Sequence, residues 1–218
     1  RQMCIRDSFQ IDLNTSFTGE DSFDVSIDAG NSAVEGVAEF DGNGSGDGLI
    51  VDGIAYTFPL TDKTTVKVGD GTDASDLFTT ACVYGGPSDT LSSCGNVNAG
   101  VGNAGAFVGA AYDFGSGFTL AVGYDGPNNS VMTAEGLDAY GANLNYAADS
   151  WGSSITYGIV ETDIGGMNDV TETEDTFIAL NAYYTPDGSL PSLSVGLKLV
   201  KSVEQTLTLT KQRVSSLV

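Results

Sequence analysis

Hydrophobic and polar residues alternate one by one along most of this chain. The clearest example is residues 104–126, where two alternating runs meet at the turn Gly115-Ser-Gly117. In the second run every other residue from Phe118 to Tyr124 is large and apolar. A period of two predicts a strand with one apolar face, and the short Gly-rich turn joins the two strands into an antiparallel hairpin.

The same alternation predicts strands along most of the remaining sequence. We expect them over residues 8–17, 23–29, 34–40, 50–58, 63–69, 138–146, 151–161, 176–184 and 193–199. Within the long connection that follows residue 69, residues 73–80 are compatible with a short helix. No run of about 18 apolar residues exists, so no transmembrane helix is predicted. The predicted fold class is therefore all-β.

The connections between these strands alternate in length. Residues 70–103, 126–136 and 162–175 are long, whereas 115–117, 148–150 and 186–190 are short. Aromatic residues gather at the short connections: Phe58, Tyr112, Phe114, Phe118, Tyr146, Trp151, Tyr183 and Tyr184. Outer-membrane barrels have short turns at one end, long loops at the other and girdles of aromatic residues. A soluble sandwich has no reason to sort its loops by length, so the pattern favours a transmembrane barrel.

The net charge and the composition of the chain argue against several classes of function. The formal net charge is −21, which argues against nucleic acid as a partner because phosphates require a basic surface. The chain has no His, the commonest general base and metal ligand. We therefore predict no enzyme, no cofactor and no metal, with a carboxylate-based hydrolase as the least favoured alternative.

Acidic residues recur on the polar faces of the first strands. In a barrel these faces line a water-filled lumen, and in a soluble sandwich they form the solvated exterior. The predicted lumen-facing acids are Asp12, Asp24, Asp28, Glu35 and Glu39.

Residues 70–103 form the longest irregular segment, and loops of that length are usually functional. We hypothesise that this segment folds inward as a constriction, with its carboxylates opposite two lysines on the barrel wall. The predicted constriction residues are Asp70, Asp73, Asp76, Asp89, Lys63 and Lys67. The alternative is that these acids are solubilising surface charge and the lysines are solvated strand residues.

Two cysteines, Cys82 and Cys94, lie in the same segment. An oxidising compartment would allow a disulfide between them, and we favour it over two free thiols in a cytosolic chain. Two thiols without His are weak evidence for zinc.

Several stretches resemble the cyanobacterial outer-membrane porins, a group related to OprB-type carbohydrate-selective porins and often labelled iron-uptake porins. They are residues 13–31, 56–69, 104–124, 138–159 and 181–196. The resemblance implies an antiparallel up-and-down transmembrane barrel of roughly 16 strands, of which this chain would hold about 10 to 12. It also implies an N-terminal peptidoglycan-binding domain that is absent here. We expect residues 9–200 to be a partial barrel, residues 1–8 a non-native segment and residues 201–218 a doubtful C-terminal segment.

The resulting hypothesis is an outer-membrane porin for small hydrophilic solutes or inorganic ions, surrounded by lipid. No residue identifies iron or a sugar, and homo-oligomerisation is left open. One alternative is an acidic secreted or surface β-protein, an adhesin or a calcium-dependent module. Asp41, Asn43, Ser45 and Asp52 have the spacing of a calcium loop, but flanking helices and the terminal Glu are missing, which favours a plain turn. Another alternative is a barrel that serves only as an anchor.

Overall fold

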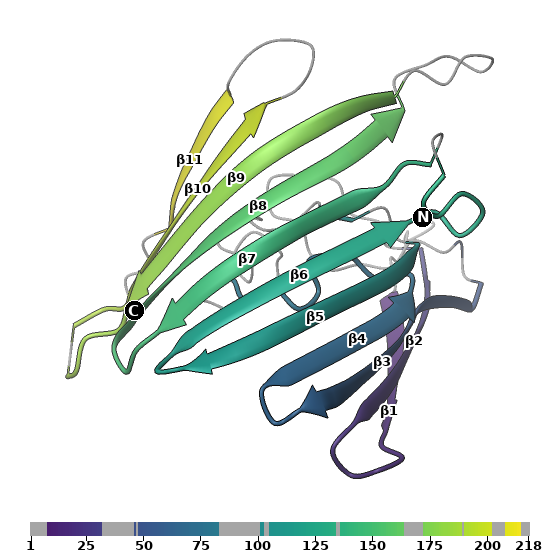
Figure 1. Ribbon diagram of the computed structural model, residues 1–218, viewed down its shortest axis with the longest axis horizontal. Coiled ribbons are helices and arrows are strands. Elements are labelled where there is room, and N and C mark those ends of the chain that lie inside the picture. The colour runs from purple at the N-terminus through teal and green to yellow at the C-terminus, as the bar shows by residue number, and fades with distance from the viewer. Residues whose placement is uncertain are drawn as a thin grey trace, which may run out of the picture.

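The strands form one antiparallel sheet (Figure 1). The computed structural model describes residues 8–31, 46, 48–82, 101–102, 105–133, 136–163, 172–188, 190–201 and 208–214. Within them the strands are β1 (Ser8–Thr15), β2 (Ser22–Gly30), β3 (Ile50–Thr61), β4 (Thr64–Asp70), β5 (Ala106–Gly115), β6 (Phe118–Gly126), β7 (Ala139–Ala147), β8 (Trp151–Asp163), β9 (Glu172–Tyr184), β10 (Leu193–Lys201) and β11 (Thr208–Val214).

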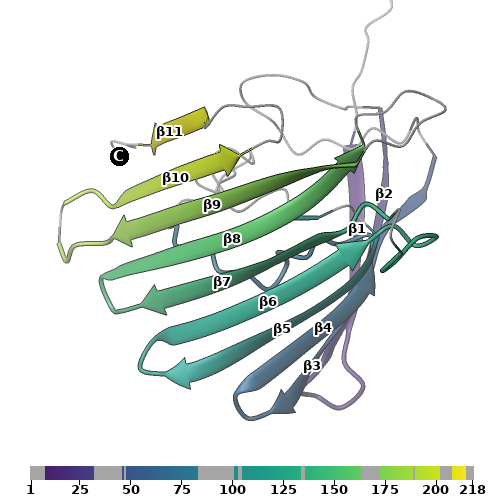
Figure 2. The ribbon, with the colours of Figure 1, turned by 45° about the horizontal axis from the view of Figure 1, so that its top comes forward.

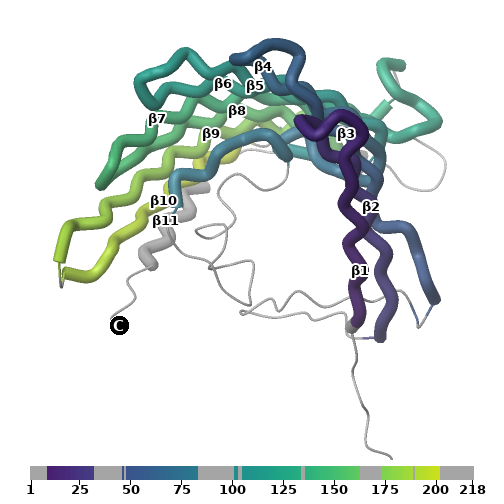
Figure 3. The backbone as a smooth tube through the Cα atoms, turned by 90° about the horizontal axis from the view of Figure 1, so that it is seen from below, coloured from purple at the N-terminus to yellow at the C-terminus, as the bar shows by residue number. Residues whose placement is uncertain are grey.

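The topology is a simple up-and-down meander. The order of the 11 strands in the sheet is their order in the sequence. The sheet curls without closing, so β1 and β11 each pair with a single neighbour, and Figures 2 and 3 show the resulting arch. The predicted fold class, an antiparallel up-and-down sheet of about 10 to 12 strands that forms an incomplete barrel, is confirmed.

The two faces of the arch differ in chemistry. Large apolar side chains lie exposed on the convex face, among them Leu120, Leu144 and Ile155. The concave face carries small and polar residues such as Ala121, Asn143 and Ser154, which alternate with them along the same strands and are buried. This is the reverse of a soluble sheet protein, in which the large apolar face is the covered one. In the part of the chain that the structure describes, no helix is long and apolar enough to cross a membrane.

Aromatic rings line the convex face at the short-turn end. The rings of Phe118, Tyr146 and Trp151 form a continuous row across β6, β7 and β8, with centroids 4.6 Å and 4.8 Å apart. Tyr184 lies beside Trp151 in the β8–β9 register. Tyr183 departs from the predicted girdle, because its ring turns inward over Gly152.

Some element boundaries differ from those expected. β8 and β9 are longer than predicted because their pairing continues up to Asp163 and Glu172. β4 begins at Thr64, so Lys63 lies in the turn. Residues 73–80 form two successive turns rather than a helix, with i→i+3 hydrogen bonds to the carbonyls of Asp73 and Ser75. β11 lies within the segment 201–218, and the predicted strand 34–40 and residues 1–7 lie outside the described residues.

Candidate functional site

Residues 71–82, called the inner segment below, lie within the hollow of the arch (Figure 3). The segment leaves the long-loop end of β4 and crosses the concave faces of β6, β7 and β8 in turn. Ala74 lies against β6, Thr79 is bonded to β7, and the backbone N–H of Ala81 donates to the Ser154 hydroxyl of β8 at 3.3 Å. Residues 71–82 of the connection therefore lie on the concave side of the sheet, and their role as a constriction stays a prediction.

A row of four glycines crosses the wall where the inner segment lies. Gly109, Gly123, Gly141 and Gly158 are paired residue to residue across β5, β6, β7 and β8. The carbonyl of Ala74 occupies the space that a Cβ atom on Gly123 would need. Glycine at position 123 lets the loop backbone approach the sheet closely, which is a recognised use of glycine inside strands.

Asn143 is the main polar anchor of the inner segment. Its side-chain Oδ1 accepts a hydrogen bond from the Thr79 backbone N–H at 3.0 Å, and its Nδ2 donates to the Thr79 carbonyl at 3.3 Å. The same Nδ2 donates to Thr156 Oγ1 at 2.8 Å, which fixes the orientation of the amide. Both Asn143 and Thr156 are fully buried. Buried polar groups need such partners, so the wall and the segment satisfy each other.

A small apolar cluster forms a second anchor closer to the long-loop end. Ala74 and Val101 from the connection pack with Ala139, Val160 and Phe177 from the wall. Val101 belongs to the returning limb of the same connection, and its carbonyl accepts a hydrogen bond from the Ser75 backbone N–H at 3.2 Å. Both limbs are thus held against the concave face.

An ion pair links the inner segment to β4, the strand that precedes it. Lys67 Nζ on β4 contacts Asp76 Oδ2. Burial raises the pKa of the nearby Asp73, and the charge of Asp76 raises it further. Asp70, at the end of β4, instead accepts a hydrogen bond from Asn128 Nδ2 at 2.8 Å.

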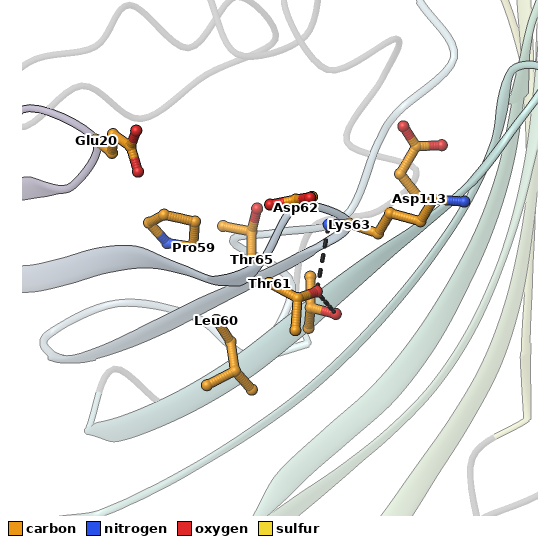
Figure 4. A pocket seen from close by; sticks show the side chains of 9 residues that line it. Glu20, Pro59, Leu60, Thr61, Asp62, Lys63, Thr65 and Asp113 are labelled. Carbon is orange, nitrogen blue, oxygen red and sulfur yellow. Dashed lines mark hydrogen bonds between the residues drawn. The ribbon is translucent and has the colours of Figure 1, made fainter.

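Lys63 is placed away from this group, which the sequence analysis did not anticipate. It sits at the tip of the β3–β4 hairpin at the short-turn end, where its backbone N–H lies 3.3 Å from Thr61 Oγ1 (Figure 4). An open pocket of about 590 Å³ lies there between the β1–β2 and β3–β4 turns. Its lining residues are Glu20, Pro59, Leu60, Thr61, Asp62, Lys63, Thr64, Thr65 and Asp113. Of the two lysines, only Lys67 is brought to the inner segment.

The acids of the first strands, Asp12 and Asp24, are hydrogen-bonded to neighbouring serine side chains. Asp12 accepts a hydrogen bond from Ser26 at 2.6 Å, and Asp24 accepts one from Ser22 at 2.7 Å. Ser22 pairs with Thr57, which pairs with Lys67, so these acids share the concave face with Lys67. Asp28 is buried.

The remaining predicted residues are only partly covered. Glu35, Glu39, Asp89 and Cys94 lie outside the described residues, as do Asp41, Asn43 and Ser45 of the calcium-like tract; Asp52 is in β3. Cys82, at the end of the inner segment, is disulfide-bonded. Its pairing with Cys94 stays a prediction. Within the described residues no group of three or more carboxylates and cysteines is arranged to hold a metal.

The residues that hold the inner segment were not predicted from the sequence. Asn143, Ser154 and Thr156 read as ordinary polar positions of alternating strands. A signal was present in the glycines, because Gly109, Gly123, Gly141 and Gly158 all interrupt otherwise regular strands. Their alignment only becomes visible once the strand register is known.

No protein-family model matches the chain, and no curated protein matches it. Among solved structures, two mutants of the Rhodobacter blastica porin are similar, each with 12% sequence identity and a TM-score of 0.45. Each match covers 91% of this chain and 75% of the porin chain.

Proposed function

We propose that this chain forms part of the wall of an outer-membrane diffusion channel for small hydrophilic solutes or ions. Passive diffusion through such a channel involves no catalytic reaction. A barrel satisfies its backbone hydrogen bonds within the sheet and presents polar side chains to a water-filled lumen.

The observation that carries the proposal is the exposed apolar band on the convex face. Along β8 the outward residues run from Trp151 to Ile159 without a charge, and the next outward residue is Glu161. Trp151 pairs with Tyr184 at one boundary, and Glu161 pairs with Glu174 at the other. An apolar face of this extent is costly in water and is expected in lipid.

The height of this band fits a membrane. Trp151 and Glu161 are ten residues apart, which is about 34 Å along a strand at about 3.4 Å per residue. A strand tilt of about 40° reduces this to about 26 Å, close to the apolar band of about 25 Å in outer-membrane barrels.

The inner segment supplies the narrowing that a selective channel requires. It occupies the hollow of the arch, where Asp76 contacts Lys67 and Asp73 lies near Asp76. Charged groups at the narrowest point govern which ions pass. Together with Asp12, Asp24 and the net charge of −21, they favour cations over anions.

The finer assignment rests on sequence resemblance. The stretches quoted above favour the cyanobacterial OprB-type and iron-uptake group, and hence uptake of a nutrient solute or inorganic ion. Swelling of liposomes that contain the full-length protein, in a series of sugars and iron complexes, would identify the solute class.

The decisive experiment is reconstitution of the full-length protein into planar lipid bilayers. We expect stepwise single-channel currents with cation preference in a salt gradient. A protein that stays soluble and monodisperse without detergent and is stabilised by millimolar calcium would instead support the surface-module alternative. A membrane-inserted protein without conductance would support the anchor alternative.

A further inference from the structure

The contacts of the inner segment with the wall resist sliding along the sheet. They are the Thr79–Asn143 pair, the Ala81–Ser154 bond and the Lys67–Asp76 contact, and they lie on three different strands. A group inserted between the segment and the sheet therefore displaces the segment chiefly away from the sheet, toward the centre of the arch.

The glycine row decides how close to the sheet the segment lies. The three nearest atoms to a Cβ on Gly123 all belong to Ala74, and its carbonyl oxygen would overlap that Cβ. A Cβ on Gly141 would lie 2.7 Å from the Tyr157 carbonyl oxygen of the sheet, 3.2 Å from Cγ1 of Val101 and 3.3 Å from Cε2 of Phe78. A Cβ on Gly158 would lie 2.5 Å from the ring of Phe177 in the sheet and 2.9 Å from Cγ2 of Val101 in the connection.

Gly109 belongs to the same row but has a different environment. A Cβ there would meet the ring of Phe107 at 3.0 Å and the Val122 carbonyl at 3.3 Å, and both groups belong to the sheet. The row thus contains three positions that face the connection and one that does not.

Glycine inside a strand weakens it, because it has no side chain to pack and more conformational freedom to lose. Three glycines in register on neighbouring strands concentrate this loss of strand stability at one level of the wall. In return they leave a recess that accommodates Ala74, Phe78 and Val101.

We infer that Gly123, Gly141 and Gly158 form a recess that sets the bore of the channel by setting how far the inner segment projects into the lumen. These three residues are positioning residues, since they act through the segment. The inference rests on the proposed channel function and adds to it the part of the wall that controls the width.

The test is single-channel conductance of the full-length protein with Gly123→Ala, and Gly109→Ala is the matched control. The added methyl at position 123 must push Ala74 toward the lumen, so we expect a conductance about twofold lower and a smaller size limit for neutral polymers that block the current. Gly109→Ala is expected to keep the parent conductance. Circular dichroism and resistance to unfolding in SDS check that each variant is folded.

Other results would overturn the inference. A parent conductance in Gly123→Ala, or an equal fall in Gly109→Ala, would mean that the recess does not control the bore. A higher conductance would mean that the segment leaves the wall rather than shifting from it. If Gly123→Ala does not fold, Val101→Leu enlarges the connection at the recess instead and carries the same expectation. An absence of current in the parent protein would refute the channel function itself, which is a separate outcome.

Discussion

The side-chain amide of Asn143 bonds both backbone groups of Thr79, accepting from its N–H at 3.0 Å and donating to its carbonyl at 3.3 Å. The wall therefore holds the inner segment through its main chain, in the way a neighbouring strand would. Because Asn143 bonds the backbone of residue 79, the contact depends on the path of the main chain. It should tolerate replacement of the Thr79 side chain.

Replacing Asn143 by Ala should loosen the inner segment. The substitution removes two hydrogen bonds to Thr79 and one to the buried Thr156 hydroxyl, so the free energy of unfolding should fall by about 1–3 kcal/mol. Urea unfolding in lipid vesicles, followed by Trp151 fluorescence, measures this. The exposed Asn128, whose side chain bonds Asp70, provides a matched Asn128→Ala control with a smaller expected effect. Equal losses in the two variants would contradict the anchoring role of Asn143.

Reversing the charge of Lys67 should change ion selectivity. Lys67 contacts Asp76 at the inner segment, and Lys67→Glu leaves that carboxylate beside a second negative charge. We expect stronger cation preference, measured as a shift in reversal potential in a salt gradient. Lys63→Glu makes the same charge change at the hairpin tip and should shift the reversal potential much less. A larger shift from Lys63→Glu would place the selective site at the short-turn end.

A charge on the convex face should destabilise the protein in lipid. Ile155 is outward-facing near the middle of the apolar band of β8. An Arg at that depth costs about 2–4 kcal/mol in outer-membrane barrels, and less near the boundaries. Ile155→Arg should therefore lower the free energy of unfolding in vesicles more than Ser153→Arg, which lies closer to the aromatic row. Improved solubility of Ile155→Arg with unchanged stability would show that this face contacts water.

The β1–β2 turn should depend on pH through Asp21. Its carboxylate accepts hydrogen bonds from the Ser16 hydroxyl at 2.6 Å, the Thr18 backbone N–H at 2.8 Å and the Tyr56 hydroxyl at 2.7 Å. These bonds, with that of Ser16 the most important, hold the pKa of Asp21 well below its usual range.

The sign of this effect follows from proton uptake. Because the folded pKa lies below the unfolded value of about 3.9, the stabilisation is complete above about pH 4 and is lost as the pH falls toward the folded pKa. Asp21→Asn should therefore lower stability at neutral pH and flatten its decline in acid, as measured by urea unfolding at several pH values. Asp62→Asn, an exposed turn residue, is the control, and a parent-like acid decline in Asp21→Asn would assign that decline to other groups.

The alternating pattern predicts β1 to β10 and the two faces of these strands, but not β11. Phe118 to Tyr124 alternates strictly, so both the strand β6 and its outward side follow from the sequence. The same reasoning failed at Lys63, because the pattern of Thr65 and Lys67 extends smoothly into the turn. Turn geometry near Pro59, where the β3–β4 register shifts, decides where pairing stops.

The contacts of the inner segment could not be predicted in the same way. Ala81 and Ser154 are 73 residues apart, and their meeting depends on the curvature of the sheet and on the register of several strands. The negative charge of residues 73 and 76 suggested a site, and Lys67 was a suitable partner. Nothing local to Asn143 indicated that it would hold a loop, and the interruption of the strands by glycines became informative only with the strand register.

The contact between Thr79 and Asn143 joins residues far apart in the sequence, and this affects the order in which the molecule assembles. Hairpins such as β5–β6 bring together residues that are neighbours in the chain and therefore form early. Thr79 is bound by β7, which pairs with β8. Both strands are synthesised later than Thr79, and β7 must first pair with β6. In an arch that forms from its amino-terminal side, Thr79 meets its partner in the wall only after β7 has paired with β6, so the inner segment takes its place in the hollow after that pairing.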